Sequence, residues 1–220
     1  MIAQQTLLDH NPETGQNITM EEIQDLAVMR PDQVNVPEEI QEAIRSLIRW
    51  AGDDPDREGL IDTPKRVAKA WKYYCRGYRE DPENHLKTVF EEVGGYDDIV
   101  LLKDIPFYSH CEHHMAPIMG HAHIAYLPDK KVVGLSKLAR VLKGYAHRLQ
   151  IQERLTAQVA DCIWNNLRPR GVAVVISAVH SCMAARGVET PNVQTVTKTL
   201  RGIYSEDPEQ AKMILNLMGV

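Results

Sequence analysis

The stretch IVLLKDIPFYSHCEHHMAPIMGHAHIAYL, residues 99–127, decides how the rest of the chain can fold. Its two ends, 99–107 and 118–127, are rich in apolar and β-branched residues with partial alternation, which predicts two strands. Between them lies HCEHH, residues 110–114, where one thiol stands among three imidazoles. The pattern therefore predicts a pair of strands whose connection carries metal-ligand chemistry.

A second pair of strands is predicted further along the chain. Residues 172–179 form a β-branched run, and residues 195–200 read as the matching last strand. Two helices separate the two pairs. The first is capped by Ser136 and continues through Tyr145, and the second runs from about 151 to 167.

Two smaller elements complete this part of the chain. A short strand is predicted at 132–133, and a closing helix follows Asp207-Pro208. Adjacent strands joined in this order favour an antiparallel sheet. We therefore predict an α+β fold, in which an antiparallel four-stranded sheet carries two helices on one face.

The part before the first strand is predicted to contain helices only. A capping box predicts a short helix over 19–29. Two amphipathic helices are predicted over 37–52 and 63–77, each with a proline at its start. The chain is therefore divided into an N-terminal arm and helical region, 1–95, and a catalytic domain, 96–220.

Composition restricts the class of protein. The chain has 220 residues, of which 44% are hydrophobic and 25% charged, as in ordinary soluble globular proteins. No apolar run approaches the roughly 18 residues of a membrane span, and the N-terminus lacks a signal-peptide core. We expect a cytoplasmic protein with no membrane partner. The formal charge of −5 argues against general nucleic-acid binding.

A second ligand-type cluster, His180 and Cys182, follows the predicted strand 172–179. Zinc favours Cys and His ligands, and a catalytic zinc keeps three of them plus a water. In a strand Cys111 would share a face with His113, whereas in a turn it would converge with His114. Because the segment is a connection, we prefer Cys111, His114 and Cys182 as ligands. His113 and His180 then remain as acid–base groups near neutral pH.

Other residues of ligand type have simpler interpretations. His121 and His123 share one face of a predicted strand and form a rival metal pair, but no third ligand is near them in sequence. Cys75 and Cys162 fall on apolar faces of predicted helices, where a thiol behaves as a small buried hydrophobe. We therefore leave these four residues out of the site.

An anion site is predicted at the start of the helix after Gly134. A helix N-terminus presents unpaired N–H groups, and Ser136, Lys137 and Arg140 lie in its first turns. Arg186, four residues after Cys182, would add a cation next to the metal. Such a set suits a polyphosphate.

Gln152 and Glu153 open the second helix and form a candidate base-recognition pair. A carboxylate beside an amide suits a guanine edge, which offers N1–H and an exocyclic amine as donors and a carbonyl as acceptor. An acid at a helix start also suits the helix dipole alone, so this assignment is the least specific. Metal, anion and purine-like sites together predict metal-assisted hydrolysis of a phosphorylated small molecule.

At these residues the chain closely resembles the GTP cyclohydrolase I family. The resemblance extends from about residue 40 to 202 and keeps the family's order. The matching motifs are Gly52–Leu60 with Asp62–Ala68, Cys111–His114, Gly134–Arg140, Gln152–Thr156 and His180–Val188.

The resemblance implies a tunnelling fold (T-fold), assembled as a homodecamer of two pentameric rings with active sites between subunits. It also implies one zinc ion per subunit, held by Cys111, His114 and Cys182. The remaining implied roles are triphosphate binding by Ser136, Lys137, Arg140 and Arg186, guanine binding by Gln152 and Glu153, and proton transfer by His113 and His180, with Ser136 assisting the ribose step.

The implied reaction opens the imidazole ring of GTP. Water adds to C8, formate leaves, and rearrangement of the ribose with ring closure gives 7,8-dihydroneopterin triphosphate. The resemblance does not decide whether this product feeds folate, a deazapurine nucleoside or a pterin cofactor. It also assigns no role to residues 1–36, nor to His110 and Glu112.

Two other functions are compatible with parts of the pattern. The first is a relative of the same fold acting on another purine or pterin, which would leave Lys137, Arg140 and Arg186 without an anionic partner. The second is a silent binding oligomer with structural zinc. A structural zinc would have four protein ligands, whereas the pattern supplies three.

Overall fold

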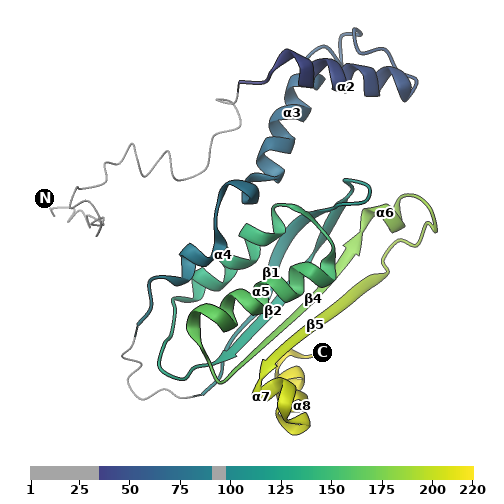
Figure 1. The fold of residues 1–220 in the computed structure, drawn as a ribbon. Coiled ribbons are helices and arrows are strands. Elements are labelled where there is room, and N and C mark those ends of the chain that lie inside the picture. The colour runs from purple at the N-terminus through teal and green to yellow at the C-terminus, as the bar shows by residue number, and fades with distance from the viewer. Residues whose placement is uncertain (1–34, 91–97) are drawn as a thin grey trace, which may run out of the picture. The chain divides into compact units, whose positions relative to one another are not determined.

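The computed structural model describes residues 35–90 and 98–220 (Figure 1). The chain divides into two compact units between Tyr73 and Tyr74. The helix predicted over 19–29 lies outside the described residues, and the domain limit at 95/96 stays a prediction. Of the helices that are described, none has the length and apolar character needed to cross a membrane.

The first unit contains the two helices predicted for it. Helix α2, Glu38–Trp50, follows Pro37, and it has acids in its first turn and Arg49 in its last turn, which suits the helix dipole. Helix α3, Thr63–Tyr74, begins at the predicted threonine. It ends three residues earlier than predicted, because the chain tightens into the 3-10 helix η2, Arg76–Arg79.

The second unit is built on a sheet with strand order β3-β1-β2-β4-β5. Its strands are β1, Val100–Cys111; β2, Pro117–Leu127; β3, Leu149–Gln150; β4, Gly171–His180; and β5, Gln194–Gly202. The pairs β1–β2, β2–β4 and β4–β5 are antiparallel, and β3 runs parallel to β1.

This sheet corrects the prediction of a four-stranded antiparallel sheet. The four long strands are present, but the sheet is mixed and has a fifth strand of two residues. Strand β3 forms where the chain passes the end of β1 between two helices, and two residues are too few to show a strand pattern. The strand predicted at 132–133 is absent, since Val132 makes only an isolated bridge to Phe90.

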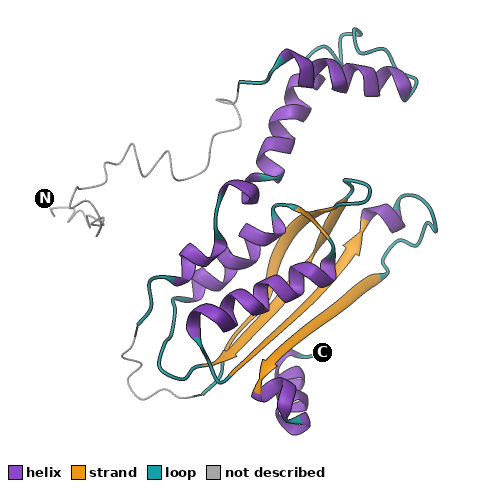
Figure 2. Ribbon diagram, viewed as in Figure 1, coloured by secondary structure: helices purple, strands orange, loops and turns teal. Residues whose placement is uncertain are grey.

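Helices lie on both faces of the sheet (Figure 2). The helices that follow α3 are η3, Pro82–Leu86; α4, Leu135–Ala146; α5, Gln152–Leu167; α6, Ser181–Ala184; α7, Ile203–Glu206; and α8, Pro208–Met218. Helices α4 and α5 cover one face, as predicted, and α7 and α8 pack on the other. Gly134 stands at the N-cap of α4, so the prediction of Ser136 as the cap is wrong by two positions.

The strand period of two decides which residues form the larger core. Along β2 and β4 the even-numbered residues face α4 and α5, and those in the middle of the strands, such as Ile124 and Val174, are fully buried. Leu142 and Ile163 meet them from the helices. The odd-numbered residues face the opposite side of the sheet, where residues such as Val175 pack with α7 and α8 in a smaller hydrophobic cluster.

Strand β1 contains a bulge that changes which side chains face the helices. Its register against β2 shifts between Leu102 and Ile105, where one extra residue is inserted. Asp104 takes φ +54° there, and its N–H donates to Nδ1 of His123 over 3.2 Å. Before the bulge Leu101 packs in the smaller cluster, whereas after it Cys111 belongs to the larger core. The partial alternation of residues 99–107 reflects this insertion.

The backbone at Asp104 can be tested by substitution. Asp tolerates a positive φ, glycine adopts it freely, and a β-branched residue does not. We expect Asp104→Val to lower the free energy of unfolding by about 1–3 kcal/mol. Asp104→Gly, which removes the same carboxylate, is the control and should stay near wild type. Equal denaturation midpoints for the two variants would show that the bulge imposes no such constraint.

Candidate functional site

Three predicted metal ligands lie together at one end of the sheet. The ligand atoms of Cys111, His114 and Cys182 are all within 4.8 Å of one another, so the group could hold a metal ion. Cys111 is the last residue of β1, His114 lies in the turn that follows, and Cys182 lies in α6 directly after β4. Strands β1 and β4 lie on either side of β2 and both run antiparallel to it, so they end at the same edge of the sheet.

The turn after Cys111 has a defined backbone. The N–H of Met115 donates to the carbonyl of Cys111 over 2.7 Å, and the N–H of Cys111 donates to the carbonyl of Ala116 over 2.8 Å. The Sγ of Cys111 lies 4.0 Å from Nδ1 of His114 and 3.9 Å from Nδ1 of His113. Of these two histidines, His114 and not His113 belongs to the group that includes Cys182.

The two thiols differ in their surroundings. Cys111 is buried and Cys182 is half-buried. Burial raises the pKa of the Cys182 thiol, and the adjacent Cys111 adds to the rise, whereas the nearby Arg186 guanidinium acts in the opposite direction. The guanidinium of Arg186 is therefore close enough to influence the thiol of Cys182 electrostatically.

Glu112 ties the metal turn to helix α5, a contact that sequence analysis missed. Its N–H donates to the carbonyl of Gln150 over 3.1 Å, and its carboxylate is ion-paired with Arg154. Arg154 also donates to the side chain of Gln150, which is 2% exposed and donates in turn to the carbonyl of Tyr145. Glu112 and Arg154 are 42 positions apart, so no local spacing indicated the pair.

His180 lies at the end of β4 and contacts the first residue of α5. Its Nε2 is 2.7 Å from Oε1 of Gln152, a side chain that is 1% exposed. Burial lowers the pKa of His180, and the carboxylate of Glu153 acts in the opposite direction. Glu153 itself is exposed in the first turn of α5. His113 is exposed in the metal turn.

The predicted anion-binding residues are not all near the metal group. Ser136, Lys137 and Arg140 lie at the start of α4, and Ser136 and Arg140 are exposed. The end of α4 leads into β3, which pairs with the end of β1. Because a helix of 12 residues is about 18 Å long, its start lies toward the opposite end of the sheet (Figure 1).

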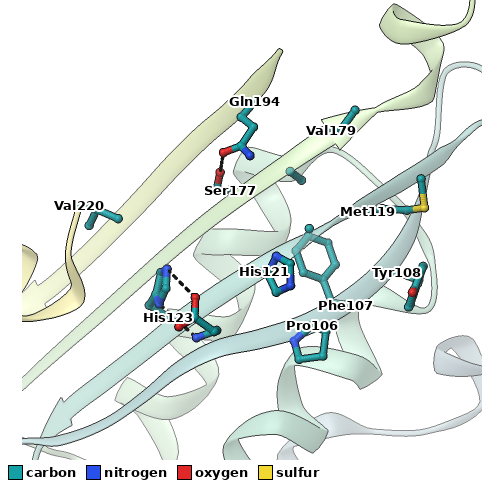
Figure 3. A pocket seen from close by; sticks show the side chains of 13 residues that line it. Pro106, Phe107, Tyr108, Met119, His121, His123, Ser177, Val179, Gln194 and Val220 are labelled. Carbon is teal, nitrogen blue, oxygen red and sulfur yellow. Dashed lines mark hydrogen bonds and ion pairs between the residues drawn. The ribbon is translucent and has the colours of Figure 1, made fainter. Parts of the chain in front are cut away.

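A separate cavity lies on the face of the sheet away from α4 and α5 (Figure 3). It measures about 450 Å³, and His121, His123, Ser177 and Gln194 are among its lining residues. The His121 and His123 pair lacks a third ligand among the described residues, and His123 is engaged by Asp104.

Cys162, Cys75 and His110 lie outside the metal group. Cys162 is 3% exposed on the inner face of α5, as predicted, and burial raises the pKa of its thiol to about 12, whereas its hydrogen bond with Tyr145 acts in the opposite direction. Cys75 is half-buried, and burial raises its pKa. His110, for which the sequence indicated no role, is 8% exposed and stacks on Tyr74 with ring centres 4.8 Å apart.

Comparison with known proteins is consistent with this site. The family model of GTP cyclohydrolase I matches residues 40–219. GTP cyclohydrolase 1 of Brucella anthropi is 59% identical over 175 residues, which are 80% of this chain and 82% of the relative. GTP cyclohydrolase 1 of Allorhizobium ampelinum is 56% identical over 178 residues, which are 80% of this chain and 89% of the relative.

Among solved structures, the archaeosine synthase QueF-Like in the apo form matches with a TM-score of 0.41 and 16% identity. The match covers 49% of this chain and 96% of that chain, and it is too distant to support an argument. The family match and the two close relatives are sufficient without it. The chain belongs to the GTP cyclohydrolase I family.

Proposed function

We propose that the group formed by Cys111, His114 and Cys182 is the zinc centre at which this chain carries out the GTP cyclohydrolase I reaction. The reaction is the hydrolytic opening of the imidazole ring of GTP, with release of formate and formation of 7,8-dihydroneopterin triphosphate. The observation that carries the proposal is the approach of these three ligand atoms to within 4.8 Å of one another.

The donor set fits zinc and fits a catalytic rather than a structural centre. Two thiols and one imidazole are ligands that zinc prefers, and a structural centre would need a fourth protein ligand. No fourth Cys, His, Asp or Glu joins the group among the described residues. Zinc held there would supply a water acidic enough to act as a nucleophile near neutral pH.

The two histidines beside the group are proposed to move protons. His180 is to protonate the purine nitrogen while C8 is attacked, and its half-buried ring, held on Gln152, suits a directed transfer. His113 neighbours the ligand His114, lies 3.9 Å from the Cys111 sulfur and is exposed toward solvent. It is placed to exchange protons during ring opening and release of formate.

The substrate's triphosphate is proposed to bind Ser136, Lys137, Arg140 and Arg186. Arg186 lies by the metal group, but the other three begin α4 about one helix length away. One chain therefore does not bring the whole set together. We propose that a neighbouring copy supplies the α4 residues, so that sites form between subunits of a homo-oligomer, as in a decamer of two pentameric rings.

Base recognition is proposed to rest on Glu153. Its carboxylate is exposed one residue from Gln152, at the helix start that approaches the metal turn. A carboxylate accepts from both the N1–H and the exocyclic amine of guanine, and this pair of donors distinguishes guanine from adenine. Gln152, the other residue predicted for this role, points its amide toward His180.

The function is tested by assaying formate and neopterin triphosphate after incubation of purified protein with GTP. Both products are expected, with about one zinc per subunit. A chelator should abolish turnover, and added zinc should restore it, because the nucleophilic water depends on the metal. If the zinc-loaded protein leaves the ultraviolet spectrum of GTP unchanged, the proposed reaction is wrong.

The ligand assignment is tested by metal analysis of three variants. Cys111→Ser and Cys182→Ser are expected to lose zinc and turnover, because each removes one of three protein ligands. His180→Ala should keep its zinc and lose ring opening. Loss of zinc in His180→Ala would place that histidine among the ligands and contradict the assignment.

The contact between Glu112 and Arg154 is expected to position the metal turn. Partners that orient metal ligands contribute about tenfold or more to metal affinity, so Glu112→Ala should weaken zinc binding about tenfold in a chelator competition. The charge-reversed double variant, Glu112→Arg with Arg154→Glu, should recover part of the loss. Asp161→Ala, which breaks the comparably exposed pair with Arg201, is the control. Unchanged affinity in Glu112→Ala would remove this role.

A further inference from the structure

We propose that Gln152 is a positioning residue for His180 and does not read the guanine edge. The inference rests on the proposed function of His180 in proton transfer. It reassigns one of the two residues that the resemblance gave to base recognition, and it leaves that role at the start of α5 to Glu153.

The surrounding hydrogen bonds fix the orientation of the Gln152 side-chain amide. Its Nε2 donates to the main-chain carbonyl of Thr195 over 2.8 Å and to that of Ile176 over 3.1 Å. A carbonyl oxygen only accepts hydrogen bonds, so the end that faces two carbonyls must be the nitrogen. Nε2 also lies 3.1 Å from the hydroxyl of Thr197.

This orientation turns the Oε1 of Gln152 toward His180, 2.7 Å from its Nε2. An amide oxygen only accepts, so the Nε2 of His180 must carry a hydrogen. The hydrogen on Nε2 stays with Gln152, so the proton that His180 gives to the purine nitrogen has to be carried on Nδ1. Gln152 thereby holds the ring in one orientation and leaves Nδ1 as the nitrogen that can face the substrate.

Gln152 has no amide hydrogen left for a base, and its burial keeps the rest of the amide from one. Its side chain is 1% exposed, its two amide hydrogens are shared among three acceptors, and its oxygen serves His180. Thr156, also 1% exposed, holds the neighbouring groups in place. Its hydroxyl donates to the main-chain carbonyl of Gln152 and is hydrogen-bonded to the hydroxyl of Thr197, each over 2.7 Å. Turning the amide toward a substrate would leave the carbonyls of β4 and β5 without this donor.

The first test compares GTP binding in a background without turnover. In His180→Ala, the added change Gln152→Met should leave the Kd for GTP within about twofold, because the amide makes no substrate contact. The matched change at the next position, Glu153→Gln in the same background, should weaken GTP binding at least tenfold, since it removes a carboxylate that accepts two hydrogen bonds. A comparable loss in both variants would return Gln152 to base recognition and overturn the inference.

The second test is a double-mutant cycle on kcat. Gln152→Met alone should lower kcat about a hundredfold, in the range expected for a misplaced acid–base group. When it is combined with His180→Ala, kcat should fall no further, because both changes remove the same proton transfer by His180. Additive losses would contradict the proposal. Thermal unfolding and zinc content of each variant exclude loss of structure.

Two results keep this proposal separable from the function it rests on. If the wild-type protein releases no formate, the proposed function is wrong. If the wild type is active but the losses in kcat of the two variants are additive, only the role of Gln152 is wrong. If Gln152→Met does not fold, the position of the hydrogen on His180 is measured in the wild-type protein from the nitrogen chemical shifts of its ring. A hydrogen on Nε2 is expected, and a neutral ring with its hydrogen on Nδ1 would contradict the proposal.

Discussion

One inserted residue in β1 determines where the ligands point. Successive side chains of a strand alternate between the two faces of a sheet, so a single insertion exchanges the faces for everything after it. The hydrogen bond from Asp104 to His123 holds that insertion. Without it Cys111 would face the cluster beneath α8, on the opposite side of the sheet from His180 and Gln152.

The sheet topology then gathers three separate parts of the chain at one edge. Strands β1 and β4 flank β2 and run in the same direction, so Cys111 and His180 end their strands at the same level. The two parallel pairs of β3 bring the start of α5 beside Cys111. Because β3 pairs with β1 through two residues only, the contacts among Glu112, Gln150 and Arg154 also hold the start of α5 beside the metal turn.

Local patterns in the sequence predicted most elements of this arrangement. The four long strands and the two covering helices have clear β-branched runs or helical periods, and the spacing of Cys111 and His114 in a turn favoured that pair over Cys111 and His113. Strand β3 and the bulge were not predictable, since each involves one or two residues and depends on tertiary pairing. The contacts of Gln152 join α5 to β4 and β5, at positions 24 and 43 residues away.

The separation of α4's start from the metal group has an electrostatic consequence. Lys137 and Arg140 lie on a helix terminus that already carries positive dipole, with no acid in the first turn of α4. The described structure offers them no ion pair, so their charge is left for an anion outside this chain's own fold. In the proposed site the triphosphate would link this cluster to Arg186 at the metal group. The substrate would then connect two subunits, and we propose that binding of GTP and association of subunits favour each other.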